Sequence, residues 1–489
     1  MSPLLSLGAL GRLPGECRPL VRPGSVAAGV VHIGLGAFHR AHQALYTEEA
    51  VAAAGGDWGI VGVAPHSAAV VDALRAQDNL YSVTTVSPAG AHTRVVGALA
   101  AVRHAPADPA AVVALLADPA IRVVTLTITE KGYRLDPATG RLLDDPALAA
   151  DLTLAGGSPS TVPGLLVHGL VARERAGAGP LAIVSCDNLP ANGRRVRGLL
   201  DAAFERAGLD AGWLAANVSC PGTMVDRIVP AATDATRAFA AATLGVRDEA
   251  AVAGEPYRQW VVEDDFPSGR PAWEAAGAVL TDDAGPWERL KLRTLNGVHS
   301  ATAYLGALAG RATIAEALRV PGLAGAMRRF VADDVAPSLT PPAGVSVVAY
   351  GESVLERFAN PATGHRTIQV AMDGSQKLPQ RVLETIRDRR GAGAAPRWAA
   401  LAVAAWMRYA RGVADDGRAL PLDDPLAGEI RAAVAAAPAT AEGLAGALFG
   451  LDAVFPPEVA GDDTVRALVV EWLTSFEKHG VESTLAGLG

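Results

Sequence analysis

Lysine is scarce in this chain of 489 residues, where it supplies four of the 43 basic side chains and arginine supplies the rest. Arginine cannot release its proton near neutral pH, so a chain rich in arginine keeps lysine mainly where a compact, deprotonatable amine is needed. A biased base composition of the gene would leave the same few lysines by accident. Each one must therefore be judged by its neighbours: Lys131, Lys291, Lys377 and Lys478.

Cysteine and long apolar runs are also scarce. Cys17, Cys186 and Cys220 have neither the even number of a disulfide framework nor the Cys-x-x-Cys spacing of a structural zinc site. The longest apolar run, 398–407, is about half as long as a membrane helix, and no basic residue precedes the apolar stretch at the N-terminus. We therefore expect a cytoplasmic protein with no signal peptide, membrane span or metal site.

The charge balance argues against nucleic acid as a partner. The formal net charge is −8, and basic residues do not occur in runs that could bind phosphates. The length suits two or three domains. Nothing in the sequence indicates an oligomeric state.

The N-terminal half alternates short apolar runs with helical stretches. The runs have the continuous apolar character of strands buried on both faces, at 30–36, 59–63, 122–129 and 180–186. The helical stretches between them have the length of crossover helices, at 42–54, 67–77 and 108–119. This alternation predicts an α/β domain with a mostly parallel, doubly wound sheet over residues 1–285.

Helical patterns dominate the rest of the chain. Long stretches rich in alanine and leucine cover 286–308, 322–336, 395–413 and 464–480. We therefore expect a mostly α-helical second domain over residues 286–489.

The first predicted strand runs into a glycine loop that is typical of dinucleotide binding. Gly34 and Gly36 fill two positions of the G-x-G-x-x-G pattern, whereas His39 stands at the third. A tight glycine turn without a ligand is the alternative, but the position after the first strand of an alternating βα series favours a nucleotide. The candidate cofactor-binding residues are Gly34, Gly36, Phe38, His39, Arg40 and, after a later strand, Glu130.

The second strand lacks the acidic residue that normally holds the adenosine ribose. Residues 64–68 read Ala-Pro-His-Ser-Ala, without Asp, Glu or Arg. The local charge therefore does not separate NAD from NADP.

Lys291, Asn296 and His299 lie on one predicted helix. At about 100° per residue, Asn296 falls roughly 140° and His299 roughly 80° from the lysine, so all three share one broad face. An amine can exchange a proton with an alcohol, and an amide can hold the oxygen as charge develops on it. An exposed polar face is the alternative, which the apolar residues on each side of the trio disfavour. Gly297 costs helix stability unless something approaches the backbone there.

Two further polar clusters follow strand ends, where ligands bind in doubly wound sheets. Asn188 in SCDNLPANG is well placed for a reacting carbonyl, although an Asx turn is the alternative. For Glu130 and Lys131 in TITEKGY, contact with the site and loop electrostatics both remain open. The Tyr-x-x-x-Lys of short-chain dehydrogenases and the paired Cys/His of zinc alcohol dehydrogenases are both missing, which leaves a metal-free, lysine-dependent mechanism.

With these motifs the chain resembles the mannitol dehydrogenase family of polyol-specific long-chain dehydrogenases. The resemblance extends over nearly the whole chain through segments such as HIGLGAFHRAHQALYT, SCDNLPANG, LKLRTLNGVHSATAYLG and MDGSQKLPQR. It implies a Rossmann-type N-terminal domain, a mostly helical C-terminal domain, an active site in the cleft between them, NAD as cofactor and no metal. It makes Lys291 the general acid/base, Asn188 and Asn296 the hole for the substrate oxygen, and His299 a hydrogen-bond partner of that oxygen. Asp226 and Lys377 match positions that line the polyol site.

The segment 365–381 is more similar to the hexonate enzymes of the family, because Gln369 stands where the mannitol enzymes carry an arginine. A uronate needs a cationic partner for its carboxylate, and Arg366, Lys377 and Arg381 are candidates. The leading hypothesis is an NAD-dependent reductase that interconverts a keto-hexuronate and a hexonate, with fructuronate and mannonate as the best guess. The alternatives are a mannitol or arabinitol dehydrogenase and, from another class, a nucleotide-binding protein without catalysis.

Overall fold

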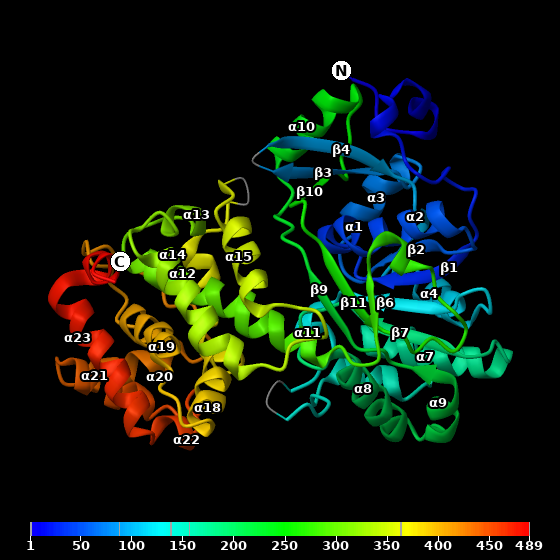
Figure 1. Cartoon of the computed structure of the whole chain (residues 1–489). Coiled ribbons are helices and arrows are strands. Elements are labelled where there is room, and N and C mark those ends of the chain that lie inside the picture. The colour runs from blue at the N-terminus through cyan, green and yellow to red at the C-terminus, as the bar shows by residue number, and fades with distance from the viewer. Residues whose placement is uncertain (1, 88, 137–138, 156, 362–363, 489) are drawn as a thin grey trace. The chain divides into compact units, whose positions relative to one another are not determined.

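The computed structural model describes residues 2–87, 89–136, 139–155, 157–361 and 364–488. The chain forms two compact units, Met1–Gly285 and Pro286–Gly489, which are described separately (Figure 1).

The first unit is built on a six-stranded sheet in which neighbouring strands are parallel. Its strands, in spatial order, are β5 (Leu99–His104), β2 (Gly59–Ala64), β1 (Ala28–Ile33), β6 (Val123–Leu126), β7 (Leu181–Ser185) and β8 (Val218–Ser219). Counted along the chain within this sheet, that order is 3-2-1-4-5-6, the arrangement of a dinucleotide-binding Rossmann fold. The predicted α/β fold class is therefore confirmed.

Both faces of this sheet are covered, which explains why its strands are apolar without interruption. Successive side chains point to opposite faces: Val30 packs in one apolar cluster and Val31 in the other. The first cluster includes residues of α2 (Gln43–Ala54) and α3 (Ala69–Ala76). The second includes residues of α4 (Pro109–Ala117), α7 (Val162–Ala176) and α8 (Asn192–Ala207).

Two three-stranded sheets complete the first unit. One has the order β10 (Val252–Gly254), β3 (Tyr81–Ser87) and β4 (Gly90–Val96), and the other β12 (Val279–Thr281), β11 (Gln259–Glu263) and β9 (Thr223–Asp226). The sequence interpretation missed β5, an edge strand in which Leu99 and Val102 are buried and the other four residues are half-buried.

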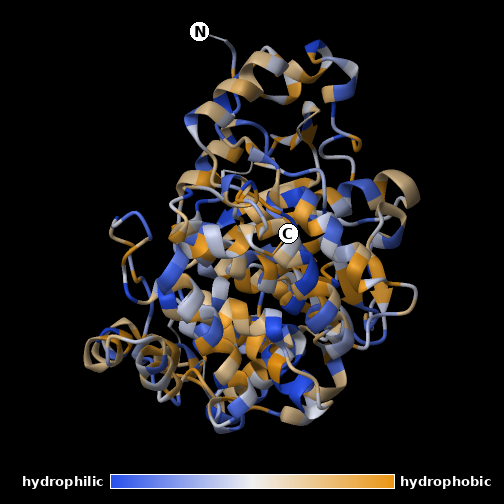
Figure 2. Cartoon of the chain, turned by 60° about the vertical axis from the view of Figure 1, so that its left-hand side comes forward, coloured by the Kyte–Doolittle hydropathy of each residue, from blue (hydrophilic) through white to orange (hydrophobic). Residues whose placement is uncertain are grey.

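The second unit is helical, and its strand pairing over residues 286–361 and 364–488 is limited to isolated bridges. Its longer helices are α12 (Gly297–Leu308), α15 (Val347–Phe358), α18 (Glu384–Gly391), α19 (Arg397–Tyr409), α20 (Ala427–Ala436), α21 (Ala441–Phe449) and α23 (Asp463–Ala486). Its shorter ones include α13 (Ile314–Ala317), α14 (Leu323–Arg329), α16 (Thr367–Val370), α17 (Gly374–Leu378) and α22 (Pro457–Ala460). The ribbons carry both hydrophobic and hydrophilic stretches, as expected of helices packed on one side (Figure 2).

The predicted helix 286–308 is wrong in one respect, because it is not a continuous α-helix. The segment α11 (Gly285–Leu290) passes into a π-helical turn, Lys291–Asn296, before α12 begins. Two more π-helical turns occur at Phe330–Val335 and Pro379–Leu383. Pro379 has no N–H to donate to the preceding turn, which accounts for the departure from α geometry at the third.

Among the residues that the structure describes, we find no helix with the length and apolar character needed to cross a membrane.

Candidate functional site

The glycine loop lies against the ends of β2 and β6. The amides of Gly34 and Leu35 both donate to the Val63 carbonyl oxygen, at 2.9 and 3.2 Å. Gly34 has a φ of +113°, and a Cβ there would lie 2.0 Å from the Thr127 carbonyl oxygen. Packing within the protein thus requires glycine at this position.

Gly36 is exposed and is not required by packing. Among the described residues, an added Cβ would meet only the Gly34 carbonyl oxygen, at 3.7 Å. Gly36 is the N-cap of α1 (Ala37–Ala41) and has no side chain to satisfy the first amides of that helix. A glycine of this kind allows close approach of a pyrophosphate, so the loop fits a nicotinamide dinucleotide.

The side chain of His39, a predicted cofactor-binding residue, is turned into the protein. The His39 ring is fully buried and stacks on His32, with ring centroids 3.4 Å apart and planes 10° apart. Burial, and then the neighbouring His32, lowers the pKa of His39 well below its usual value. At the third fingerprint position a glycine normally allows the helix to pack closely on the strand. Here the His39 ring makes the contact with the strand by stacking on His32 of β1.

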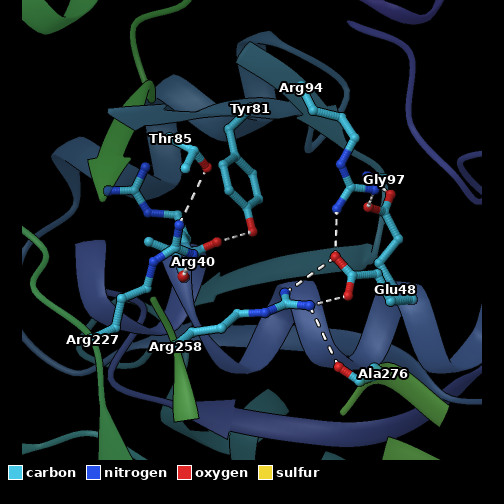
Figure 3. Close-up of polar contacts among 11 residues, drawn as sticks. Arg40, Glu48, Tyr81, Thr85, Arg94, Gly97, Arg227, Arg258 and Ala276 are labelled. Atoms are coloured by element: carbon cyan, nitrogen blue, oxygen red, sulfur yellow. Dashed lines mark hydrogen bonds and ion pairs between the residues drawn. The ribbon is translucent and has the colours of Figure 1, made fainter. Parts of the chain in front are cut away.

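The side chain of Arg40, another predicted cofactor-binding residue, is also turned into the protein. Its Nε donates to the Gly36 carbonyl oxygen at 3.2 Å, and its guanidinium also contacts the Ala250 carbonyl oxygen. Figure 3 shows Arg40 beside Tyr81, whose hydroxyl donates to the Arg40 carbonyl oxygen at 2.9 Å. Arg40 therefore connects the loop to the β10–β3–β4 sheet. Phe38 is half-buried and stacks on His42.

The ends of β6 and β7 are joined through Asp187. Its carboxylate accepts the amides of Ile128 and Thr129 at 3.0 Å and the Tyr133 hydroxyl at 2.7 Å. Burial raises the pKa of Asp187. Asp187 is thus the structural residue of the SCDN segment, and Asn188 is the exposed polar side chain at the strand end.

The remaining candidates of the first unit differ in exposure. Glu130 and Lys131 are exposed on α5 (Thr129–Gly132). Asp226 is buried at the end of β9.

Lys291 begins the π-helical turn and its side chain is buried. The Gly297 amide donates to the Leu292 carbonyl oxygen, five residues earlier, as the π geometry requires. Residues five apart stand one turn above each other in such a helix, so Asn296 lies much closer in direction to Lys291 than the α-helical angle of roughly 140° predicts. The wider turn therefore places the Lys291 amine and the Asn296 amide more nearly on the same side of the helix than an α-helix would.

Gly297 is glycine because another segment approaches it. A Cβ at Gly297 would lie 2.9 Å from the Arg381 carbonyl oxygen and 3.2 Å from the Phe330 ring. The expectation that something approaches the backbone here is confirmed, and the approaching groups belong to the other two π-helical turns.

His299 lies in a cationic neighbourhood. Its ring stacks on Phe358 and His365, with centroids 4.4 and 5.4 Å away. Burial lowers the pKa of His299 well below its usual value, with further lowering from His365, Arg381, Lys377 and Arg357. The ring is therefore neutral, and its Nε2 has no hydrogen-bond partner among the described residues.

Lys377 and Arg381 stand one helical turn apart beside this histidine. The Lys377 amine donates to the Met372 carbonyl oxygen at 2.5 Å and lies 3.9 Å from Asp373. Burial, then Arg381, lowers the pKa of Lys377 to about 8. The Arg381 guanidinium donates to Ser300 Oγ at 3.0 Å, and burial lowers its pKa to about 10.

Arg366 is exposed at the start of α16, and no described contact joins its side chain to this cluster. Sequence reasoning missed His365 and Arg357 as members. His365 precedes Arg366 and could have been noticed as one of ten histidines, whereas the helical pattern of α15 carries no sign that Arg357 faces His299.

Family models for the Rossmann domain and the C-terminal domain of mannitol dehydrogenase match residues 28–275 and 283–474. This chain belongs to the mannitol dehydrogenase family. It is therefore an oxidoreductase, and the predicted resemblance is confirmed.

Relatives within the family differ in their described activities. The chain is 45% identical over 457 residues to the uncharacterized oxidoreductase YeiQ of Escherichia coli, covering 92% of this chain and 93% of the relative. It is 41% identical over 423 residues to D-mannonate oxidoreductase of E. coli, covering 84% and 87%. A ternary complex of Pseudomonas fluorescens mannitol 2-dehydrogenase with NAD and D-mannitol matches with a TM-score of 0.84 and 34% identity, covering 99% of both chains.

Proposed function

We propose that this protein is a cytoplasmic, NAD-dependent reductase that interconverts a keto-hexuronate and a hexonate, with fructuronate and mannonate as the best candidates. The observation that carries the proposal is the cationic group around His299, to which Lys377 and Arg381 contribute. A sugar acid brings a carboxylate that such a group can bind, whereas a neutral polyol does not. The 41% identity to D-mannonate oxidoreductase supports the same substrate class.

Lys291 is the proposed general acid/base. When bound, NAD supplies the nicotinamide carbon that accepts or delivers the hydride. In its uncharged form the lysine amine takes the hydroxyl proton of the alcohol during oxidation, and in its charged form it returns a proton to the carbonyl oxygen during reduction. Burial of the Lys291 side chain protects this proton transfer from bulk water.

Asn296, Asn188 and His299 are the proposed partners of the substrate oxygen. Asn296 lies one π-helical turn after Lys291, so its amide can donate to the oxygen that the lysine protonates. The neutral His299 ring can offer its Nε2 to the same oxygen, if that nitrogen carries the proton. Asp226 is the proposed partner of substrate hydroxyl groups.

Arg366, Lys377 and Arg381 are the proposed partners of the substrate carboxylate. Lys377 and Arg381 have the stronger support because they lie in the same cluster as His299. The alternative is a polyol dehydrogenase acting on mannitol or arabinitol, which the similarity to mannitol 2-dehydrogenase over 99% of the chain favours.

Steady-state assays with fructuronate, mannonate, mannitol, arabinitol and fructose would separate these substrates. We expect kcat/KM for fructuronate reduction with NADH to exceed that for fructose by at least a hundredfold, because only the acid can pair with the cationic group. A preference for mannitol or arabinitol would favour the alternative. NADH binding without turnover of any substrate would instead indicate a nucleotide-binding protein.

The catalytic role is tested by Lys291→Ala. General acid/base catalysis contributes about 10²- to 10⁴-fold, so kcat should fall by that factor while the Kd for NADH stays within threefold. Lys478→Ala, which removes an exposed lysine of the last helix, is the matched control and should leave kcat unchanged. Near-normal turnover of Lys291→Ala would exclude the mechanism.

A further inference from the structure

Arg293 is a buried cation inside the π-helical turn that begins at Lys291. The residue is only 3% exposed and belongs to the segment Lys291–Asn296. A buried charge lowers stability unless it is paired and hydrogen-bonded, so an apolar side chain would serve packing alone at less cost. The contacts of the guanidinium therefore indicate what this arginine does.

The guanidinium bonds to two other segments of the helical unit. One terminal nitrogen donates to the carbonyl oxygen and the Oγ of Ser338, at 3.0 and 3.2 Å, and to the Asp388 carboxylate at 2.6 Å. The other terminal nitrogen donates to the Glu384 carboxylate at 3.1 Å. Both carboxylates are half-buried, so these charge-assisted bonds are partly shielded from water. The planar fork of arginine fits several fixed acceptors at once, whereas a lysine ammonium is a point charge.

Each of these two segments follows one of the other π-helical turns. Ser338 ends the 3₁₀ turn that continues the π-helical turn Phe330–Val335, and its Oγ donates to the last carbonyl oxygen of that turn at 2.8 Å. Glu384 and Asp388 lie on α18, which begins directly after the π-helical turn Pro379–Leu383. The side chain of one arginine thus joins the three π-helical turns.

Arg293 does not face the Lys291 amine. Residues two apart on a helix do not face each other, so the guanidinium lies on a different side of the helix from that amine. It acts instead on the backbone between Lys291 and Asn296, which its bonds connect to α18. The π-helix is rare and mostly appears as single turns, frequently at functional sites. A contact that holds this turn therefore also holds the relative direction of the amine and the amide.

We propose that Arg293 is a positioning residue, which keeps the turn Lys291–Asn296 in its π-helical form and so sets the arrangement of the lysine amine and the Asn296 amide for catalysis. Without the bonds of Arg293 the turn relaxes toward α-helical geometry, in which the two side chains diverge by roughly 140°. The inference rests on the proposed function, in which Lys291 carries the proton.

Arg293→Met tests the proposal because methionine keeps an unbranched side chain and lacks the donors. We expect kcat for the best substrate of the parent protein to fall at least tenfold, while the KM of that substrate and the Kd for NADH stay within threefold. Arg328→Met is the matched control, because it removes an exposed arginine that pairs with Glu352 in the same unit, and it should change none of the three. A kcat of Arg293→Met within threefold of the parent value would overturn the proposal.

A double-mutant cycle separates positioning from a general loss of stability. Because Arg293 acts through the arrangement of the amine and the amide, the factor by which Arg293→Met lowers kcat should shrink at least threefold in a protein that carries Asn296→Ala. The same factor in both backgrounds would contradict the proposal. If Arg293→Met does not fold, Glu384→Gln combined with Asp388→Asn removes the same ion pairs from the other side and should give the same two results.

Acetylation of lysine side chains reports on the turn without any turnover. The four lysines can be followed one by one by mass spectrometry, and the buried Lys291 should react at least tenfold more slowly than the exposed Lys131 and Lys478. In Arg293→Met we expect the rate of Lys291 to rise at least threefold relative to these two. An unchanged relative rate would overturn the inference. Absence of turnover by the parent protein would instead overturn the proposed function, which distinguishes the two failures.

Discussion

At the scale of single residues, Gly34 and Gly36 occupy equivalent-looking positions of one loop for different physical reasons. Gly34 adopts a left-handed φ of +113° against the Thr127 backbone, so the fold itself needs glycine there. Gly36 has a φ of −93°, which any residue can adopt, and it packs closely against nothing in the described part of the chain. Both glycines belong to one sequence motif, but only the folded structure distinguishes the glycine that packing requires from the glycine that suits a ligand.

The two glycines therefore predict opposite outcomes on substitution with alanine. Gly34→Ala should lower the free energy of unfolding by about 3 kcal/mol or more, because its Cβ would collide with backbone at an unfavourable φ. Gly36→Ala should change stability by less than about 1 kcal/mol and raise the Kd for NADH at least tenfold. Urea unfolding and NADH titration measure the two effects. Tight NADH binding by Gly36→Ala would show that this glycine is not required for the cofactor.

At the scale of elements, the π-helical turn determines how Lys291 and Asn296 are arranged. Helical periodicity identified the segment, yet periodicity assumes one angle per residue and cannot reveal where that angle changes. The cause lies in packing, since the π-helical turns at Lys291–Asn296 and Pro379–Leu383 meet where the Arg381 carbonyl oxygen approaches Gly297. A feature that depends on a segment more than eighty residues away is not readable from local sequence.

Gly297→Ala tests this packing. Alanine gains about 1 kcal/mol of helix propensity, but a Cβ at 2.9 Å from the Arg381 oxygen overpacks the contact, which costs about 1–3 kcal/mol. We expect lower thermal stability and a kcat reduced at least tenfold, with NADH binding unchanged. The control is Gly325→Ala inside α14, where a Cβ would contact nothing within 4 Å and stability should stay equal or rise. A fully active Gly297→Ala protein would mean that the contact does not position Lys291.

At the scale of the whole molecule, buried ionisable groups make folding depend on pH in opposing directions. Burial raises the pKa of Glu48 to about 7, although Arg94 and the Gly97 amide bond its carboxylate (Figure 3). The folded state therefore binds this proton more strongly, and stability is lost as pH rises toward 7. Burial lowers the pKa of His32 to about 3 and that of its stacking partner His39 well below 6.5. The unfolded state binds these protons more strongly, so stability is lost as pH falls below 6.5.

His39→Phe isolates the histidine contribution, because it keeps an aromatic ring on His32 and removes one titrating group. Each proton taken up on unfolding changes stability by about 1.4 kcal/mol per pH unit. Between pH 6 and 4, the stability of the parent protein should therefore fall more steeply than that of His39→Phe by up to this amount, as measured by urea unfolding at each pH. His92→Gln, at an exposed histidine, should leave the slope unchanged. Parallel pH profiles for the parent and His39→Phe would contradict the assigned effect of burial.

The fold class and the family could be predicted from the sequence, because the alternating strands and helices, the glycine loop and the lysine segment are all local patterns. The sequence also determined which side chains can supply the chemistry, since four lysines and six asparagines leave few candidates. The family models that match residues 28–275 and 283–474 confirm the predicted family.

The surroundings of each candidate side chain, in contrast, depend on how the chain folds. Folding turned His39 and Arg40 into the protein, assigned Asp187 to the backbone of a neighbouring strand end, and placed His365 beside His299. It also brought Arg75 of α3 to the Val102 carbonyl oxygen of the edge strand β5, which Arg103 bonds as well. These contacts depend on parallel strand pairing and helix packing, which bring together residues far apart in the chain. They therefore cannot be predicted from local sequence patterns.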